Sequence, residues 1–223
     1  METSQGTKEG DSRKRAVSGR ISERLRPSVC KESRRFDDEG TRFAIKGVVF
    51  NLLEQVVSEE AGEPAWERAI TESGVDGAYT SLGTYPHEEL AALADSLAAQ
   101  LGVEPDDAVM WFGKKALPKL AALYPQLFEA HGGTLPFLST LNDIIHPEVR
   151  KLYPGADVPV FDYRLIESDR MLMGYRSQRG LCFFGQGLIE GAGEYFSEDL
   201  RVAQTTCEKR GDSECVFEVV LAS

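Results

Sequence analysis

The sequence lacks the long apolar runs that would place it in a membrane. Its 223 residues are 42% hydrophobic, which is enough for a core, but no stretch of about 18 apolar residues occurs, so no membrane-spanning helix is expected. The N-terminus is polar and has no apolar signal core, which argues against secretion. Four cysteines in a chain of this length do not indicate a disulfide scaffold. A reduced, cytoplasmic location is the simplest interpretation.

Motifs of common catalytic sites are also missing. The sequence has no GxSxG nucleophile motif, and the glycines of GQGLIEG at 185–191 do not follow the GxGxxG spacing of a phosphate-binding loop. No pair of carboxylates stands out among the 36 Asp and Glu residues. The sequence therefore predicts a protein that is not an enzyme.

Positive charge is scarce outside the N-terminal segment. Residues 1–44 carry eleven Lys and Arg against eight Asp and Glu, whereas residues 45–223 carry 14 against 28. Such an acidic body argues against nucleic acid or an anionic membrane as the main partner. Few aliphatic residues and no periodicity predict a disordered extension over 1–44, either a nonspecific tail or a basic arm.

From residue 45 onward, the pattern is first helical and then mixed. Apolar spacing predicts helices over 45–57, 64–74, 87–102, 104–125 (bent at Pro118) and 135–154. Two strands follow over 158–168 and 170–177, then a glycine-rich helix over 181–196 and two strands within 199–222. We expect an α+β fold with an N-terminal helical subdomain packed on a C-terminal antiparallel sheet with helices. The small residues of the last helix could permit close approach of something bulky: Gly185, Gly187, Gly191, Ala192 and Gly193.

Histidine is scarce, and His146 differs from the other two in its surroundings. Apolar neighbours at helical spacing place it near an apolar surface, where a lone histidine is more often a hydrogen-bonded core residue than a ligand. Pro147 removes a backbone N–H and disfavours helical angles at the residue before it, so a kink or break is expected at His146. The bend is either ordinary or a device that aims the imidazole at something bound.

The stretch YRSQR at 175–179 places a phenol, a hydroxyl and a guanidinium at alternate positions. In an extended strand, Tyr175, Ser177 and Arg179 would share one face. All three donate hydrogen bonds, and the arginine fork suits a carboxylate or a phosphate. The row therefore predicts an anion site directly before the glycine-rich helix.

Three cysteines of the C-terminal half could meet in space. Cys207 and Cys215 bracket the turn CEKRGDSEC, and Cys182 begins the glycine-rich helix. Three thiolates could bind zinc, which takes four nitrogen or sulfur ligands, but the nearest fourth candidate is Gln204, whose amide is a poor zinc ligand. Free buried thiols are the alternative.

Taken together, KGVVFNLLEQVV, LNDIIHPEVRKLYPGADVP, and YRSQRGL ahead of GLIEGA resemble the H-NOX family, the heme nitric oxide/oxygen binding domains. The resemblance covers residues 45–223. It implies heme b between the two halves, with His146 as the proximal iron ligand. It also implies that Tyr175, Ser177 and Arg179 hold the heme propionates and that Pro159 presses on the porphyrin.

The same resemblance implies which gas is bound. Relatives that hold oxygen carry a distal tyrosine where this chain has Phe184, and the other matching distal positions are apolar: Val49, Leu53, Leu120 and Leu188. Bound oxygen needs a hydrogen-bond donor and NO does not, so the expected ligand is NO, with CO also possible and oxygen excluded.

Signalling is expected to start on the side of the heme that His146 would bind. NO weakens the bond opposite to it, so release of His146 from iron would let the two halves shift, and His146→Gly would mimic that state. Stand-alone relatives regulate a separate histidine kinase, in two-component regulation, or a diguanylate cyclase or phosphodiesterase of cyclic-di-GMP signalling. A partner of this kind in trans is implied.

Two departures from the family pattern bear on these expectations. Some relatives bind zinc through three cysteines and a histidine; Cys182, Cys207 and Cys215 match, but Gln204 stands at the histidine position. The family's common Met-Lys-Gly start reads Ile45-Lys46-Gly47 here, so residues 1–44 could reflect an over-extended start.

One rival resemblance comes from a different class of protein. The ending CEKRGDSECVFEVV also resembles small-molecule-binding domains of the four-vinyl-reductase type. Such an adaptor would bind an apolar ligand without iron, and it would need neither His146 nor the polar triad.

Overall fold

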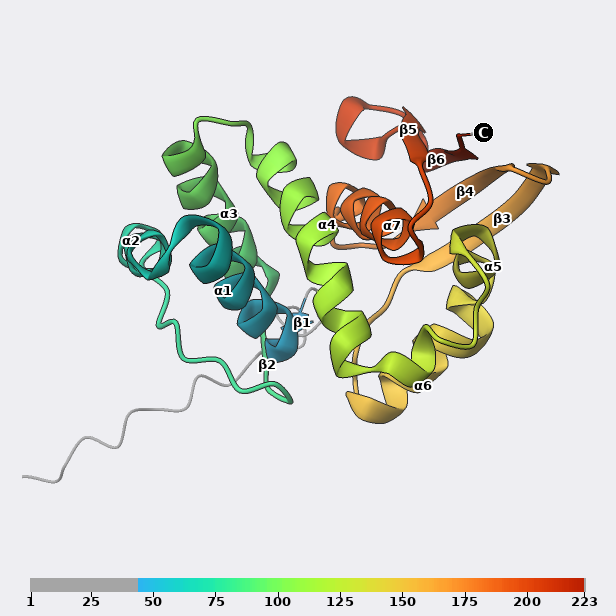
Figure 1. Ribbon diagram of the computed structural model, residues 1–223. Helices are drawn as coiled ribbons and strands as arrows, with labels where there is room; N and C mark the ends of the chain where they lie inside the picture. Colours follow the sequence, from blue (N-terminus) through green and yellow to red (C-terminus); the bar gives the residue numbers. More distant parts are fainter. Residues whose placement is uncertain (1–43, 223) are drawn as a thin grey trace, which may run out of the picture. The chain divides into compact units, whose positions relative to one another are not determined.

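The computed structural model describes residues 44–222 (Figure 1). The predicted extension over 1–44 therefore lies, except for Ala44, outside the described residues. The chain begins with four helices and a two-stranded antiparallel sheet: β1 (Ala44–Lys46), α1 (Gly47–Ala61), α2 (Glu63–Ser73), β2 (Thr84–Pro86), α3 (His87–Leu101) and α4 (Pro105–Leu123). These helices confirm the first four predicted from apolar spacing, and α4 continues through Pro118.

The first four helices enclose a core of their own. Phe50, Leu90 and Leu93 are fully buried there, and Phe112 and Ala116 of α4 close it from one side. Gly74 ends α2 in the left-handed conformation that an L side chain rarely adopts. The helical half is thus a packed unit with α4 at its border.

The predicted fifth helix over 135–154 is instead three short segments, which corrects the sequence-based expectation. They are α5 (Thr134–Leu138), a π-helical turn η2 (Leu141–Ile145) and α6 (His146–Leu152), preceded by the 3-10 turn η1 (Pro125–Leu127). Ser139 and Thr140 donate their hydroxyl groups to carbonyls at the end of α5, which competes with a regular helix. Pro147 has no N–H for the Asp143 carbonyl, and the Ile145 N–H bonds five residues back to Thr140. The backbone therefore changes from π to α hydrogen bonding beside His146, but His146 itself keeps α-helical angles (φ −66°, ψ −37°), which corrects the expectation that Pro147 would break the helix there.

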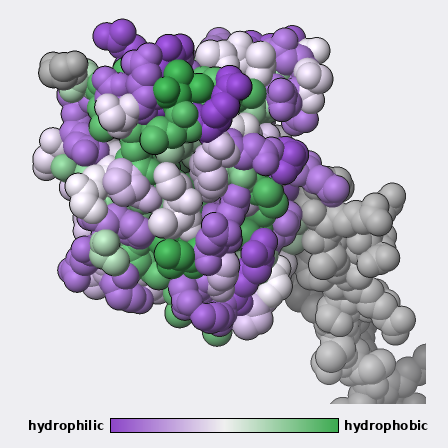
Figure 2. All heavy atoms as spheres, turned by 90° about the vertical axis from the view of Figure 1, so that its right-hand side faces the viewer, coloured by the Kyte–Doolittle hydropathy of each residue, from purple (hydrophilic) through white to green (hydrophobic). Residues whose placement is uncertain are grey.

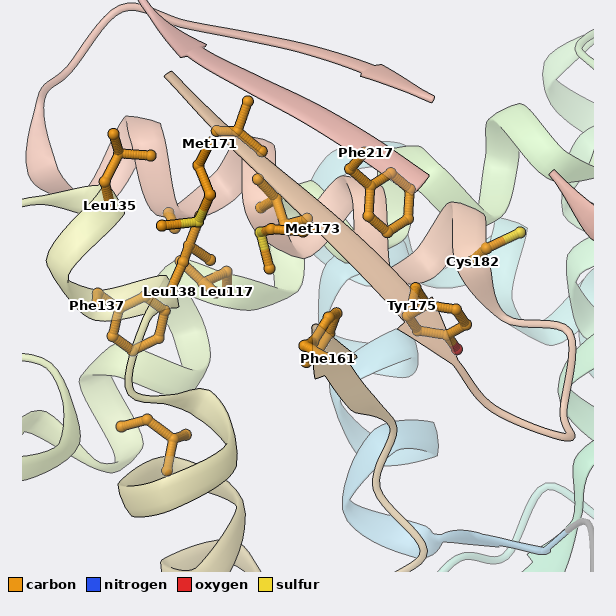
Figure 3. Packing of buried hydrophobic residues seen from close by; sticks show 14 of the residues in the cluster. Leu117, Leu135, Phe137, Leu138, Phe161, Met171, Met173, Tyr175, Cys182 and Phe217 are labelled. Carbon is orange, nitrogen blue, oxygen red and sulfur yellow. The ribbon is translucent and has the colours of Figure 1, made fainter. Parts of the chain in front are cut away.

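The C-terminal half is a four-stranded antiparallel sheet with one long helix. The strands are β3 (Val160–Glu167), β4 (Arg170–Arg176), β5 (Leu200–Thr206) and β6 (Cys215–Leu221), in the order β3-β4-β6-β5. Helix α7 (Cys182–Phe196) lies between β4 and β5 in sequence, and a 3-10 turn, η3 (Glu208–Arg210), joins β5 to β6. Alternate residues of the central strands are fully buried, among them Met171, Met173, Phe217 and Val219 (Figure 3). The α+β prediction is confirmed, and β3 and β4 correspond to the two strands predicted over 158–168 and 170–177.

The two halves meet where α4 packs on α7 (Figure 1). A Cβ added to Gly187 would lie 2.0 Å from the Met110 carbonyl oxygen, and one added to Gly191 would lie 2.5 Å from that of Lys114. Gly113 of α4 is equally tight, with the Phe184 carbonyl oxygen 2.4 Å from such a Cβ. Gly187 and Gly191 therefore allow the backbone of α4 to approach α7 closely. The bulky neighbour expected from the sequence is this helix.

On the side of the β3–β4 hairpin, hydrophobic atoms gather in patches separated by hydrophilic ones (Figure 2). Leu165 and Ile166 near the end of β3 are 60% and 38% exposed. Across residues 44–222, no helix combines the length and the apolar character needed to cross a membrane.

Candidate functional site

A cavity of about 260 Å³ lies where the two cores meet. Its walls are mainly apolar side chains from both halves of the fold, including Val49 and Leu52 of α1, Leu117 and Leu120 of α4, and Leu188 and Ile189 of α7. Polar groups gather where Lys46, Asp157 and Arg179 reach its lining. Such a cavity suits a large apolar ligand that carries charge at one edge.

His146 lies in this cavity wall, at the junction of the π turn and α6. Its ring packs against Phe161, with centroids 5.8 Å apart, and Nδ1 is buried on the side of the Pro159 backbone. Burial lowers the pKa of His146 to about 4, Arg150 and Arg179 add to the shift, and the Pro159 backbone opposes it. The imidazole is therefore neutral at pH 7, the form that coordinates a metal.

Asn142 fixes the π turn to the sheet. Its side-chain nitrogen donates to the Phe161 carbonyl at 2.6 Å, and its oxygen accepts the Phe161 N–H at 3.1 Å. The clamp holds the π turn that precedes His146 against Phe161, the second residue of β3. Sequence reasoning missed Asn142; the signal was an amide beside Asp143 in LNDII, whose other three residues are apolar.

Replacing Asn142 with alanine is expected to lower the free energy of unfolding by about 1–3 kcal/mol, because two backbone groups of β3 lose their partner in a half-buried place. Urea denaturation measures the change. Asn51→Ala is the matched control, since Asn51 donates to Ser81 at an exposed position and should cost about 0.5 kcal/mol or less. Equal losses in the two variants would contradict the clamp.

The polar triad does not form one row on a strand, which corrects that expectation. Strand β4 ends at Arg176, and Ser177 and Arg179 lie in the turn before α7, which Gly180 continues with a φ of +62°. The Arg179 N–H donates to the Ser177 hydroxyl at 3.3 Å. Tyr175 and Arg179 still reach the cavity lining, whereas Ser177 does not.

Tyr175 is buried at the end of β4, with its ring edge-on to Phe161 (Figure 3). Burial raises the pKa of the phenol to about 12, while Ser177 and the charge of Arg179 oppose the shift. The phenol therefore stays protonated and remains a hydrogen-bond donor at neutral pH.

Arg179 brings a nearly buried positive charge to the same edge, with 10% of its side chain exposed. Its guanidinium donates to the Asp157 backbone carbonyl. Its Nε lies 3.6 Å from the Asp157 carboxylate, too far for a hydrogen bond, and is buried without another partner among the described residues. This unused donor is available to an anion in the cavity.

The wall formed by α1, α4 and α7 is apolar. Val49, Leu120, Phe184 and Leu188 all line the cavity, as the sequence led us to expect. Leu53 is buried in the N-terminal core instead, and its neighbour Leu52 reaches the lining. The Phe184 ring stacks on Phe112 with centroids 5.1 Å apart.

Two tyrosines that sequence reasoning missed join the helix ends beside the cavity. The hydroxyl groups of Tyr124, after α4, and Tyr153, after α6, are hydrogen-bonded to each other, and both residues line the cavity. Burial raises the Tyr153 pKa, and its bond to Tyr124 raises it further. The pair ties the helix that carries His146 to the helix that borders both cores. In the sequence, the signal for this pair is that each tyrosine directly precedes a proline at a helix end.

These residues fit the heme that the resemblance implies. A neutral imidazole in the wall, an apolar cavity and a buried guanidinium with a spare donor are what a porphyrin with two carboxylates requires. Pro159 lines the cavity on the side of His146 and Phe161.

The three cysteines converge as the sequence suggested, away from this cavity. Cys182, Cys207 and Cys215 are buried, and their sulfur atoms lie within 4.8 Å of one another. Burial raises the pKa of the Cys182 thiol to about 12 and raises that of Cys215. Gln204, the fourth member named from the sequence, offers an amide, so the set does not provide the four nitrogen or sulfur ligands of a structural zinc site.

Comparison with protein families gives one match. The sequence profile described as haem-NO-binding matches residues 46–204. A search of curated proteins found no significant match.

Solved structures of similar fold come from proteins of the same description. The chain is similar to the H-NOX protein of S. oneidensis in the Fe(II)NO state, with 27% identity, a TM-score of 0.75, and coverage of 80% of this chain and 100% of that one. It is similar to the unliganded Fe(II) H-NOX protein of K. algicida, with 28% identity, a TM-score of 0.72, and coverage of 80% and 97%. It is also similar to the IWP-051-bound H-NOX of Shewanella woodyi in the Fe(II)CO state, with 29% identity, a TM-score of 0.68, and coverage of 80% of this chain and 95% of that one.

Proposed function

The chain belongs to the haem-NO-binding, or H-NOX, family, and from this premise we propose that it is a sensor of nitric oxide that binds heme b. The observation that carries the proposal is the neutral imidazole of His146 in the wall of a mainly apolar cavity. His146 would hold the iron of a ferrous heme, and that iron would supply the binding of a diatomic gas. The residues of this chain would determine how the heme is held and which gas remains bound.

At the polar edge of the cavity, Tyr175 and Arg179 would hold the propionates, with Ser177 orienting the turn. Arg179 has a free Nε donor, and the Tyr175 phenol is protonated at neutral pH. Exchange of the Asp157 contact for a propionate would leave the guanidinium paired. Pro159 and Phe161 would support the ring from the side of His146.

The Arg179→Ala variant is expected to lose heme about ten to a hundred times faster than the wild type, because hydrogen bonds to charged groups contribute about 1.5–3 kcal/mol. Transfer of heme to a scavenging globin, followed by absorbance, measures the rate. Arg176→Ala is the control, since Arg176 pairs with Asp162 at an exposed position near the same strand end. A similar rate in both variants would rule out a role for Arg179 in holding the propionates.

The distal wall supports NO, with CO as a second ligand, over oxygen. Bound oxygen is polarised and needs a donor, whereas Phe184, Leu188 and Leu120 offer none. The ferrous protein should therefore bind NO and CO and give no reversible change in air.

A hydroxyl introduced at the distal wall should reverse this selection. Phe184→Tyr is expected to give an absorbance change in air that reverses under nitrogen, because the phenol can donate to a polar diatomic ligand. Phe184→Leu is the control, since it opens space without adding a donor. Oxygen binding by wild type and Phe184→Leu alike would refute the distal argument.

Sensing, rather than catalysis, is the proposed role. The distal side provides no acid or base for a reaction. Release of His146 from iron on NO binding would free α6 and the π turn, which Asn142 and the Tyr124–Tyr153 pair connect to β3 and α4. We propose that a histidine kinase or a cyclic-di-GMP enzyme, as a separate protein, reads this change.

The rival is an adaptor of the four-vinyl-reductase type that binds an apolar ligand without iron. A Soret band in the purified protein separates the two, because only heme produces it. The protein reconstituted with ferrous heme should bind NO with a shift of that band. Failure to take up heme would refute the sensor and leave the adaptor.

A further inference from the structure

The cysteine cluster has the geometry of a site for one cation. Cys182 begins α7, Cys207 follows β5 and Cys215 begins β6, and their side chains are at most 2% exposed. The sulfur atoms of Cys182 and Cys207 lie 3.8 Å apart. Three sulfurs that share a cation at about 2.3 Å each lie about 3.8–4.0 Å from one another, so the thiols stand close to ligating positions.

A fourth protein ligand suited to zinc is missing. No other His, Cys, Asp or Glu of the described residues joins the group, and Asp212 is engaged by the Cys207 N–H at 2.7 Å. Gln204 places its amide here, with oxygen and nitrogen both buried and without a hydrogen-bond partner among the described residues. Zinc takes four nitrogen or sulfur ligands in closed sites, and an amide does not replace one of them.

The three buried thiols that remain as ligands favour a soft cation of low coordination number. The Glu208 N–H points at the Cys215 sulfur at 3.4 Å and would support a thiolate. Burial excludes the water that would complete the shell of zinc or a harder cation. Thiolate ligands select monovalent copper, a closed-shell ion that is satisfied by three sulfurs.

We propose that Cys182, Cys207 and Cys215 form a three-sulfur site for a soft monovalent cation, with monovalent copper as the ion bound, in place of the zinc of related proteins. Binding forms three copper–sulfur bonds and releases the three thiol protons to solvent. The Gln204 amide sits beside this site as a neighbour of the Cys182 sulfur. The three cysteines lie outside the cavity lining, beside Tyr175, and the proposal does not depend on the proposed function.

The test uses the full chain with heme bound, in a Cys30→Ser background that removes the fourth cysteine. Samples are dialysed without oxygen against buffered monovalent copper or against zinc, and the metal per chain is measured by mass spectrometry, with iron counted separately. We expect about one copper per chain and little zinc. Each of Cys182→Ser, Cys207→Ser and Cys215→Ser should lose the copper, with far-ultraviolet circular dichroism reporting that the fold is retained.

Gln204→His provides the decisive comparison, because it supplies the missing nitrogen ligand. This variant should retain zinc at least about tenfold more tightly than the parent protein. If the parent protein retained zinc as tightly as Gln204→His does, the parent would itself be a zinc site, and the proposal would be overturned. Absence of copper, or copper that survives the serine substitutions, would overturn it as well.

Discussion

Replacing His146 with glycine is expected to leave the purified protein largely without heme, and added imidazole should restore heme binding. Among the described residues that line the cavity, His146 is the only histidine, and no other neutral nitrogen donor of that wall can take its place on iron. The substitution also opens a space between the π turn and Phe161 that a free imidazole can fill. The Soret absorbance per chain, with and without imidazole, measures both effects.

His131→Gly is the control for this experiment. His131 lies outside the cavity lining, 3.4 Å from the Thr140 hydroxyl and edge-on to Phe137, so its removal should leave the heme content unchanged. With imidazole on the iron, the His146→Gly variant should act on its partner as the NO-bound wild type does, whether or not NO is present, because α6 is no longer attached. Normal heme content without imidazole would exclude His146 as the ligand.

Replacing Gly187 with alanine is expected to destabilise the fold by about 3 kcal/mol or more, the upper end for overpacked interiors. The new Cβ would lie 2.0 Å from the Met110 carbonyl oxygen, a backbone atom that cannot move without shifting α4. Helix propensity acts in the opposite direction, since alanine is about 1 kcal/mol better than glycine inside a helix. A net loss in urea denaturation would therefore report the helix contact itself.

Gly132→Ala serves as its control. A Cβ at Gly132 meets nothing within 4 Å, and its φ lies outside the left-handed region, so the change should stay within about 0.5 kcal/mol. If Gly187→Ala were as stable as the wild type, the close approach of α4 and α7 would be wrong.

Much of the fold could be predicted from local pattern. Apolar spacing located the long helices, whereas the break expected at His146–Pro147 did not form: Pro147 only removes one N–H, and His146 keeps α-helical angles. The π turn was not predictable from the sequence. It forms because the Ile145 N–H bonds to the Thr140 carbonyl rather than to the Leu141 carbonyl, as it would in an α-helix. The glycine contacts of α7 were not predictable either, because their partners lie in α4, more than 70 residues earlier in the chain.

The candidate site shows the same limit. The positions of His146, Phe184 and Arg179 at the cavity follow from motifs, but the shape of the polar edge does not. Strand β4 stops at Arg176 because both partners begin there: β6 at Cys215, opposite Tyr175, and β3 at Val160, opposite Arg176. These partners lie 40 and 16 positions away in the chain. Similarly, Leu52 rather than Leu53 faces the cavity, a choice made by the rotation of α1 against α4.

The place of α4 between the two cores has a thermodynamic consequence. Phe112 and Ala116 belong to the N-terminal core, while Leu117 and Ala121 of the same helix belong to the C-terminal one. Neither core is complete without this helix, so loss of its structure exposes both. Residues 44–222 are therefore expected to unfold as one cooperative unit, in which the apolar wall of the cavity and the sheet beside His146 melt together.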